Sequence, residues 1–371
     1  MPQVTLADIS KIIFRNSRLF IPKCIEHAIE QTVENSADAI NLAGEELMAR
    51  YGPQDAPIKF NYDRSDIVDA YGIFYTRRNV IVPRIALRDM VLNSKLQKFR
   101  PRIRVLDLGS GTGAVVLGLL EMFQHAPLDS ISVDIDAVDI AQKVLTRLKR
   151  LVEAAGLTPR SIVTINQDVT DVRNLTKKLL NRGKYDLIFS ANLFGELTDE
   201  EATGVLDCII PHLSDEGMIF IVNAPKDPFI KMMPKLVEKA TEMNLTIYYP
   251  CPPNKSHSCD ECWFWRENEY DRGFLKVGDR IMDGRYREQL TASWLTLCTE
   301  PYTIYDDFVT QYKDLDWGPL SVFGPDSATC DCQICISSGI RNRLRIGKLI
   351  KRGSIVGGAG EPFSIAKHYE L

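Results

Sequence analysis

Apolar residues recur at two different spacings along the chain, and the spacing changes near residue 100. Upstream, the segments "CIEHAIEQTVENSADAINLAGEELMARYG" and "RIALRDMVLNSKLQKF" carry them three or four positions apart, the period of an amphipathic helix. Gly52-Pro53 and Pro101 follow these segments and supply helix stops. The pattern predicts a helical N-terminal region over residues 1–95.

From residue 96 onward, short apolar runs alternate with longer amphipathic segments. The runs "IRVLDL", "SISVDID", "SIVTIN", "YDLIFSA" and "GMIFIVNAP" predict five strands, and helix-like segments separate most of them. Strands that alternate with helices are typical of a parallel, doubly wound α/β sheet. We therefore expect a Rossmann-like sheet in residues 96–245, followed by a C-terminal region of different character in residues 246–371.

The first of these strands runs into "DLGSGTG", which contains Asp107, Gly109, Gly111 and Gly113. Glycine allows the tight turn and the close backbone approach that a nucleotide-like ligand needs. The spacing from Gly109 to Ala114 also fits a dinucleotide-binding turn, but the carboxylate of Asp107 would repel a pyrophosphate. Asp107 suits the cationic groups of S-adenosylmethionine, which is the ligand we predict. NAD, or a nucleotide-binding fold without a ligand, is the alternative.

An acidic residue followed by G-x-G-x-G resembles motif I of class I methyltransferases, and the resemblance extends along the chain. It implies that Asp134 in "SVDID", with Asp136 as the substitute, ends the second strand and holds the ribose hydroxyls. It also implies that Asp168 in "NQDV" contacts the adenine, and that "FSANLFGEL", which includes Asn192, faces the methyl group. Helix capping is the alternative role for Asp134, and a structural role is the alternative for Asn192.

No residue stands out as a general base. Methyl transfer to an acceptor that is already nucleophilic needs in-line alignment and little else. Glu196 in "FGELTDEE" is the best-placed carboxylate, and capping of the following helix is its alternative role. The catalytic residues are therefore undetermined, with Asn192 and Glu196 as candidates.

Cysteines concentrate in the C-terminal third of the chain. Of nine in total, six lie in one region: Cys251, Cys259, Cys262, Cys330, Cys332 and Cys335. No secretory signal is recognised, so reduced thiols are expected rather than disulfides. Cys259 and Cys262 have the C-x-x-C spacing of metal ligands, and Cys251 is a suitable third. The fourth ligand would be one of Cys298, Cys330, Cys332, Cys335 and His257.

Zinc and an iron–sulfur cluster both accept four thiolates, and unligated thiols are the third alternative. Three segments together resemble the small-ribosomal-subunit methyltransferase-like assembly-factor family. They are "PCP" with Cys259 downstream, "CWFWRE", and "CISSGIRNRLRIGKLIKRGS". The resemblance runs from about residue 70 to the end, and it implies a [4Fe–4S] cluster on Cys251, Cys259, Cys262 and Cys335.

The chain departs from that family at three points. Only two residues separate the second and third cysteines, where the family has a wider gap. Trp263-Phe264 stands where His-Phe is usual, and Cys330 and Cys332 are additional thiols. These departures keep the identity of the fourth ligand open.

The net charge of −4 gives no global attraction to nucleic acid, so a local basic patch would have to supply it. The C-terminal segment offers six cations: Arg341, Arg343, Arg345, Lys348, Lys351 and Arg352. With the family resemblance, they imply contact with phosphates of small-subunit rRNA. A charged edge strand is the alternative.

The expected function is an S-adenosylmethionine-binding, iron–sulfur methyltransferase-like protein that methylates rRNA or assists assembly of the small ribosomal subunit. One alternative is a methyltransferase acting on a small molecule or peptide, and another is a non-catalytic metal or redox sensor. No run of eighteen apolar residues occurs, so no membrane span is expected. The protein is expected in the cytoplasm, or in the mitochondrial matrix of a eukaryote.

Overall fold

The computed structural model describes residues 19–50, 62–84, 86, 101–124, 131–224, 227–249 and 289–301. It also describes the backbone of strands at 266–271, 275–277, 280–282, 320–323, 331–335, 341–345, 355–358 and 365–369. Among the residues so described, no helix is long and apolar enough to cross a bilayer.

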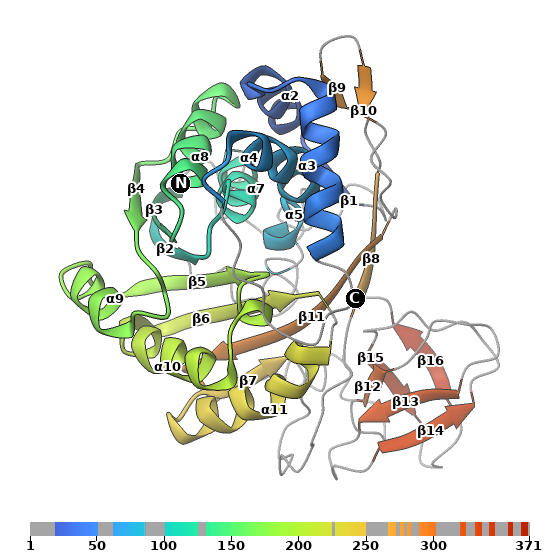
Figure 1. Ribbon diagram of the computed structural model, residues 1–371. Helices are drawn as coiled ribbons and strands as arrows, with labels where there is room; N and C mark the ends of the chain where they lie inside the picture. The colour runs from blue at the N-terminus through green and yellow to red at the C-terminus, as the bar shows by residue number, and fades with distance from the viewer. Residues whose placement is uncertain are drawn as a thin grey trace.

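A nine-stranded mixed sheet forms the centre of the molecule (Figure 1). Its parallel part is made by the five predicted strands: β2 (Arg102–Leu108), β3 (Ser132–Asp139), β4 (Ser161–Asn166), β5 (Tyr185–Ala191) and β6 (Leu213–Asn223). Their spatial order is β6-β5-β2-β3-β4. The predicted Rossmann-like α/β sheet is therefore confirmed.

Four more strands extend this sheet beyond β6. β11 (Gln289–Cys298) pairs antiparallel with β6. On its other side β11 pairs antiparallel with β7 (Thr246–Tyr249) and with β8 (Arg266–Asp271). β1 (Leu19–Phe20) pairs with β8. The expected boundary at residue 245 thus falls inside the sheet, because strands on both sides of that residue are hydrogen-bonded members of it.

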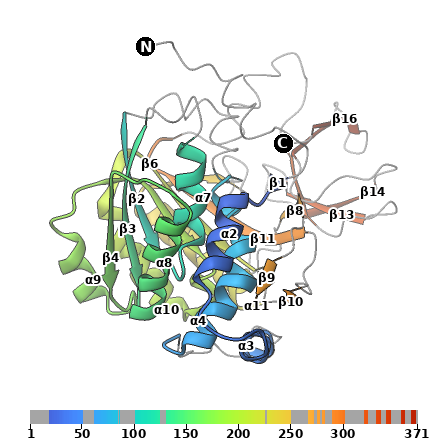
Figure 2. The ribbon, with the colours of Figure 1, turned by 90° about the horizontal axis from the view of Figure 1, so that it is seen from above.

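Helices cover both faces of the sheet, and each face has its own apolar core (Figures 1 and 2). The helices of the first face are α2 (Lys23–Thr32), α3 (Ala37–Arg50), α4 (Ser65–Tyr71), α5 (Arg77–Asn79), α7 (Ala114–Phe123) and α8 (Gln142–Ala154). Those of the second face are α9 (Val172–Leu179), α10 (Asp199–Ile209) and α11 (Asp227–Glu242). The N-terminal helices thus share one core with the sheet.

Strand β2 illustrates how the sequence serves both cores. Its side chains alternate between the two faces, as in any strand. Ile103 and Val105 belong to the core under the N-terminal helices, whereas Leu106 and Leu108 belong to the core under α9, α10 and α11. A strand buried on both faces reads as a nearly continuous apolar run, which is why the sequence pattern located it.

Within the described part of residues 1–95 the helices include α2, α3, α4 and α5, and the second predicted segment, residues 84–99, lies almost entirely outside the described residues. The first predicted segment forms two helices, α2 and α3, rather than one. A π-helical turn, η1 (Gly72–Thr76), follows α4 directly. A buried ion pair joins α4 to α8, with Asp69 Oδ1 at 3.0 Å from Arg147 Nη2.

The remaining described strands form two separate small sheets. One is a hairpin of β9 (Leu275–Val277) and β10 (Arg280–Met282). The other is antiparallel, with the order β14 (Arg341–Arg345), β13 (Asp331–Cys335), β12 (Leu320–Phe323), β15 (Ile355–Gly358) and β16 (Ile365–Tyr369). β14 is an edge strand of this second sheet, and it contains Arg341, Arg343 and Arg345 of the basic C-terminal segment.

Candidate functional site

A cavity of about 170 Å³ opens at the carboxyl end of the parallel strands. Its walls come from the glycine turn after β2, from the segments that follow β3, β4 and β5, and from Tyr62 and Tyr71 of the N-terminal region. Ligands of open α/β sheets bind at this edge, outside the carboxyl ends of the strands. We call it the glycine-turn cavity.

The glycine turn has the backbone conformation that its sequence predicts. Gly109, Gly111 and Gly113 have φ values of 64°, 50° and 91°, a region that only glycine adopts routinely. A Cβ on Gly109 would also lie 3.0 Å from Cβ of Leu193, in the loop after β5. The turn therefore leaves its backbone open to the cavity and close to the opposite wall.

The acidic residue at the end of β3 is Asp139. Its Oδ2 accepts a hydrogen bond from the backbone N–H of Gly111 at 2.8 Å, and its Oδ1 accepts one from Ala141 N–H at 2.9 Å. Burial raises the pKa of Asp139, and the three neighbouring backbone N–H groups oppose that rise. Asp139 lines the cavity and connects the ends of β2 and β3.

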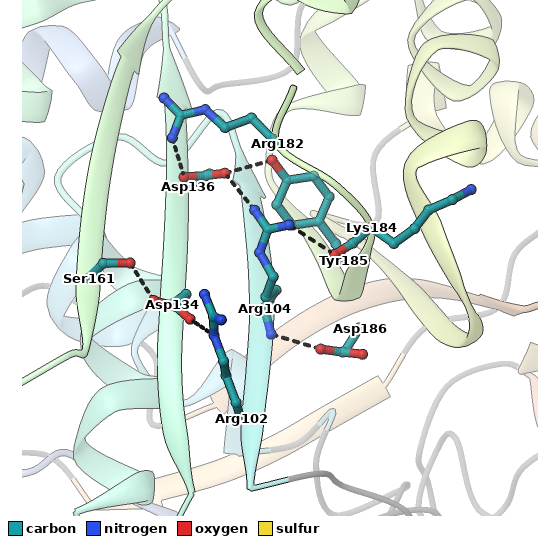
Figure 3. Close-up of polar contacts among 9 residues, drawn as sticks. All are labelled: Arg102, Arg104, Asp134, Asp136, Ser161, Arg182, Lys184, Tyr185 and Asp186. Atoms are coloured by element: carbon teal, nitrogen blue, oxygen red, sulfur yellow. Dashed lines mark hydrogen bonds and ion pairs between the residues drawn. The ribbon is translucent and has the colours of Figure 1, made fainter. Parts of the chain in front are cut away.

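The prediction that β3 ends at Asp134 is wrong, because the strand continues to Asp139. Neither Asp134 nor Asp136 lines the glycine-turn cavity; they are the third and fifth residues of β3 (Figure 3). Asp134 accepts hydrogen bonds from Arg102 and, at 2.5 Å, from the hydroxyl of Ser161. The structure thus places these carboxylates among arginines and outside the glycine-turn cavity.

Asp136 occupies a similar environment one pleat farther along β3. Its Oδ2 accepts a hydrogen bond from the Tyr185 hydroxyl at 2.7 Å, and Arg104 and Arg182 form ion pairs with it at 3.5 and 3.4 Å (Figure 3). Burial, followed by the hydrogen bond to Asp136, raises the pKa of Tyr185, so this phenol stays protonated and donates.

Asp107 lies directly behind the glycine turn at the end of β2, with only 1% of its surface exposed. Its Oδ2 has no hydrogen-bond partner in the described part of the chain. Burial, and then the nearby charge of Asp139, raise the pKa of Asp107 well above its usual value. A buried carboxyl oxygen without a donor is where a cationic ligand group, or water bound to it, would complete the hydrogen bonding.

Three further predicted residues meet in the same cavity: Asp168, Asn192 and Glu196. Oδ1 of Asp168 accepts hydrogen bonds from the backbone N–H and the hydroxyl of Thr170, at 2.9 and 2.7 Å. Asn192 has a left-handed φ of 64°, uncommon for a residue other than glycine, and its N–H donates to Val222 O at 2.7 Å. Strain of this kind concentrates at functional sites.

Glu196 ends a short 3₁₀ helix, η4 (Phe194–Glu196), and does not cap α10. Thr198 is the cap: its hydroxyl accepts the N–H of Glu201 at 3.2 Å, and Oε2 of Glu201 accepts the N–H of Thr198 at 2.9 Å. This reciprocal capping box removes the alternative role considered for Glu196.

Two tyrosines in the cavity wall were not foreseen. The ring of Tyr71 stacks on Tyr75, with centroids 5.3 Å apart, and meets the edge of Tyr62 at 5.8 Å. The π-helical turn that follows Tyr71 carries Thr76, whose hydroxyl contacts that of Thr112 in the glycine turn. Such turns are frequent at functional sites. Nothing local in the sequence distinguishes these tyrosines from core residues.

The predicted metal ligands Cys251, Cys259 and Cys262 lie outside the described residues. They belong to the segment between β7 and β8, two strands that both pair with β11. Cys335 is on β13, opposite Ser321 of β12. Cys298 is buried at the end of β11, and its thiol donates a hydrogen bond to Glu300 O at 3.2 Å. Within the described part of the chain, no group of three His, Cys, Asp or Glu side chains could hold a metal ion.

Fold and site together define a Rossmann-like protein with a cavity for a nucleotide-like ligand. Residues 84–278, more than half of the 371-residue chain, match the family described as a methyltransferase domain. The chain therefore belongs to the methyltransferase domain family.

Solved structures similar to this chain include magnesium protoporphyrin IX methyltransferase of Synechocystis PCC 6803 with bound SAM, at 11% identity and a TM-score of 0.37. That match covers 72% of this chain and 100% of the other. A ribosomal protein L11 methylase of Lactobacillus delbrueckii subsp. bulgaricus is 14% identical, with coverage of 58% and 75% and a TM-score of 0.32. TehB of Haemophilus influenzae is 18% identical, with coverage of 57% and 62% and a TM-score of 0.32. Similarity this distant carries no information on the substrate.

Proposed function

We propose that the chain binds S-adenosylmethionine in the glycine-turn cavity and transfers its methyl group to an acceptor. The observation that carries this proposal is the convergence of the glycine turn, Asp139 and Asp168 on one cavity. Asp139 at the end of β3 would hold the ribose hydroxyls, the role that the sequence pattern had suggested for Asp134. Asp168 would contact the adenine.

The charge of the cavity favours this ligand over NAD. Its described lining includes four carboxylates, those of Asp139, Asp168, Glu196 and Glu201, and no lysine or arginine. S-adenosylmethionine has a sulfonium and an ammonium against one carboxylate, whereas a dinucleotide brings a doubly charged pyrophosphate. An acidic lining attracts the former and repels the latter.

Bound S-adenosylmethionine would supply an electrophilic methyl group. This chain's own residues would hold the ligand and align the acceptor, which is the main requirement for transfer to a nucleophile. Asn192 and Glu196, both in the wall after β5, are the candidates for contact with the acceptor. A carboxylate such as that of Glu196 can also accept a proton from the acceptor.

Calorimetric titration of the full chain with S-adenosylmethionine, S-adenosylhomocysteine and NAD tests the ligand assignment. We expect the first two to bind with a stoichiometry of about one, and NAD not to bind at the same concentrations. Binding of NAD alone would refute the proposal and revive the dinucleotide alternative.

We also propose that the acceptor, or the assembly partner, is the small ribosomal subunit. The cysteine-containing segments and the basic tail support this proposal through their family resemblance. The tail contains edge strand β14, whose sequence includes Arg341, Arg343 and Arg345. Co-sedimentation with small-subunit particles over a series of salt concentrations is the test, and we expect association that weakens as salt rises. Equal association with both subunits at every salt concentration would contradict it.

A [4Fe–4S] cluster on Cys251, Cys259, Cys262 and Cys335 remains part of the proposal. Iron and sulfide analysis of anaerobically purified protein tests it, with about four irons per chain expected. A colourless protein with one zinc ion would refute the cluster and leave the proposal for the glycine-turn cavity intact.

A further inference from the structure

A second cavity, of about 370 Å³, opens near the amino end of the same parallel strands (Figure 3). Its lining contains three arginines, two aspartates, a serine, an asparagine and a single valine. We call it the arginine pocket. The two cavities share no lining residue, and Arg104, the β2 residue of the pocket nearest the glycine turn, precedes Gly109 by five positions, which at about 3.3 Å per residue is roughly 16 Å. The arginine pocket is therefore distinct from the glycine-turn cavity.

The arginine pocket lies on the sheet face that α9 and α10 cover elsewhere. Arg102 and Arg104 alternate onto the same face of β2 as Leu106. Leu106 is fully buried in the second core, whereas the side chain of Arg102 is 49% exposed. The helices thus cover the carboxyl half of this face and leave polar side chains accessible at the amino end.

Both carboxylates of the pocket are already well supplied with donors. Asp134 accepts hydrogen bonds from Arg102 and Ser161, and Asp136 is held by Tyr185 and two arginines. Three guanidinium charges against two carboxylates leave the lining with a net positive charge. The pocket therefore favours an anion over a cation.

The guanidinium groups retain donors that the described residues do not use. Arg102 bonds to Asp134 through Nε, and Arg182 bonds to Asp136 through Nη1, although each guanidinium has five N–H donors. The side chain of Arg182 is 35% exposed. Planar guanidinium groups with free donors match the paired oxygens of a phosphate, which they bind in a bidentate manner.

The third arginine, Arg104, is fixed in place by its surroundings. Its guanidinium lies 4.9 Å from the ring centroid of Tyr185, and its Nη1 donates to Lys184 O at 3.3 Å. Gly183 has a left-handed φ of 76°, and a Cβ there would lie 2.7 Å from Arg104 Nη1. A residue without a side chain at 183 is thus what leaves room for this guanidinium.

We propose that the arginine pocket binds a phosphate group of an RNA backbone. This inference rests on the proposed action on rRNA and adds a contact that lies apart from both the glycine-turn cavity and the C-terminal tail. A free phosphate or a mononucleotide has the same chemistry, so the experiment separates the two sources.

The test measures the affinity of the full chain for a fluorescein-labelled small-subunit rRNA hairpin as a function of KCl concentration. We expect the double variant Arg102→Gln, Arg182→Gln to bind at least tenfold more weakly, with the slope of log K against log salt reduced by about 1. The matched control is Arg150→Gln, because Arg150 is an exposed arginine that pairs with Glu34 elsewhere on the molecule. This control should behave as wild type.

Two glycine variants test whether RNA binding depends on the position of the Arg104 guanidinium, without any change in the charge of the protein. Gly183→Ala should weaken RNA binding by displacing Arg104 with no change in net charge. Gly156→Ala is the control, because Gly156 also has a left-handed φ, of 65°, but a Cβ there would meet nothing within 4 Å. Both substitutions carry the same backbone strain, so only the first should affect RNA.

Calorimetry with S-adenosylhomocysteine on every variant reports whether the glycine-turn cavity is intact. Unchanged RNA affinity and salt slope in the double variant would overturn the inference. The inference would also be overturned if the variants bound RNA as wild type does while inorganic phosphate or AMP bound in the pocket. The ligand of the pocket would then be a free phosphate. If wild type binds S-adenosylhomocysteine but no RNA, the inference fails and the methyltransferase proposal stands.

Discussion

The backbone N–H of Gly111 donates a hydrogen bond to Oδ2 of Asp139 at 2.8 Å, which connects the glycine turn after β2 to the end of β3. The same carboxylate lines the glycine-turn cavity. One side chain therefore shapes the turn and faces the ligand position, so a change there affects both.

Replacement of Asp139 by asparagine should weaken S-adenosylmethionine binding by about tenfold or more, since a charge-assisted hydrogen bond to a ribose hydroxyl contributes on the order of 1.5–3 kcal/mol. Asp134→Asn is the matched control, because Asp134 lies among Arg102 and Ser161 near the other end of the sheet. Calorimetry should show unchanged affinity in the control. Equal losses in both variants would contradict the assignment of Asp139.

The stability of the ligand-free protein should depend on pH through Asp107. Because burial raises its pKa in the folded state, the folded protein holds this proton at pH values where the unfolded chain has lost it. The resulting stabilisation is present below the unfolded pKa, near 4, and is lost as pH rises through the folded value. Asp107→Asn removes the ionisation. The melting temperature of this variant should therefore rise relative to that of wild type as the pH increases from 4 to 8.

The sign of that change distinguishes burial from ion pairing. A gain of a few degrees at pH 8 with none at pH 4, measured by differential scanning calorimetry, is the expected outcome. If wild type gained stability relative to Asp107→Asn as pH rose, Asp107 would instead be a carboxylate stabilised by a cationic partner. Asp107→Asn should also bind S-adenosylmethionine more weakly, because Oδ2 of Asp107 is the buried acceptor that has no hydrogen-bond partner among the described residues.

The buried ion pair between Asp69 of α4 and Arg147 of α8 should contribute strongly to the packing of these two helices. Their side chains are 2% and 4% exposed, and Oδ2 of Asp69 also accepts the N–H groups of Glu34 and Asn35 at 2.9 Å. Arg147→Ala leaves a buried carboxylate without its cation and should lower the free energy of unfolding by about 3–5 kcal/mol. Urea denaturation measures this loss.

Arg64→Ala is the control for that experiment. Arg64 forms ion pairs with Glu46 and Asp66, but its side chain is 47% exposed. An exposed ion pair contributes little to stability, so Arg64→Ala should lower the free energy of unfolding far less than Arg147→Ala. Similar losses in Arg64→Ala and Arg147→Ala would mean that burial does not strengthen the link between α4 and α8.

Tyr71 should contribute to ligand binding through its ring rather than its hydroxyl. It lines the cavity and stacks on Tyr75, and a Cβ on Gly111 would lie 3.4 Å from the ring of Tyr71. An aromatic face attracts a nearby sulfonium by about 0.5–2 kcal/mol. Tyr71→Phe should therefore retain the wild-type affinity for S-adenosylmethionine, whereas Tyr71→Leu should lose between twofold and thirtyfold. Equal affinities in the two variants would exclude a role for the aromatic face.

Local patterns predicted what depends on local chemistry. The five parallel strands were recognisable because both of their faces are buried, and the glycine turn because its φ values demand glycine. The end of β3 was misjudged because "SVDIDAVD" contains three aspartates, and the sequence of a strand does not reveal which of its polar residues a helix covers. Asp134 and Asp136 face an uncovered part of the sheet, whereas Asp139 reaches the cavity.

Local sequence patterns could not predict the sites that form from residues far apart in the chain. Tyr62 and Tyr71 enter the cavity only because α4 packs against α8 and the glycine turn, a contact between segments far apart in the chain. The arginine pocket likewise brings together residues from β2, β3, β4 and the segment after α9. The cluster on the four cysteines stays a prediction.

The position of β11 sets the order in which this protein can be completed during synthesis. β11 pairs with β6 on one side and with β7 and β8 on the other, yet it comes after all three in the chain. Until residue 298 has been made, β6 exposes an unpaired edge and β7 lacks this partner. A shortened protein that stops at residue 278, where the family match ends, would keep the glycine turn and still present an edge prone to aggregation. The cysteine-containing segment between β7 and β8 is thus synthesised before β11, the strand that pairs with β6, β7 and β8.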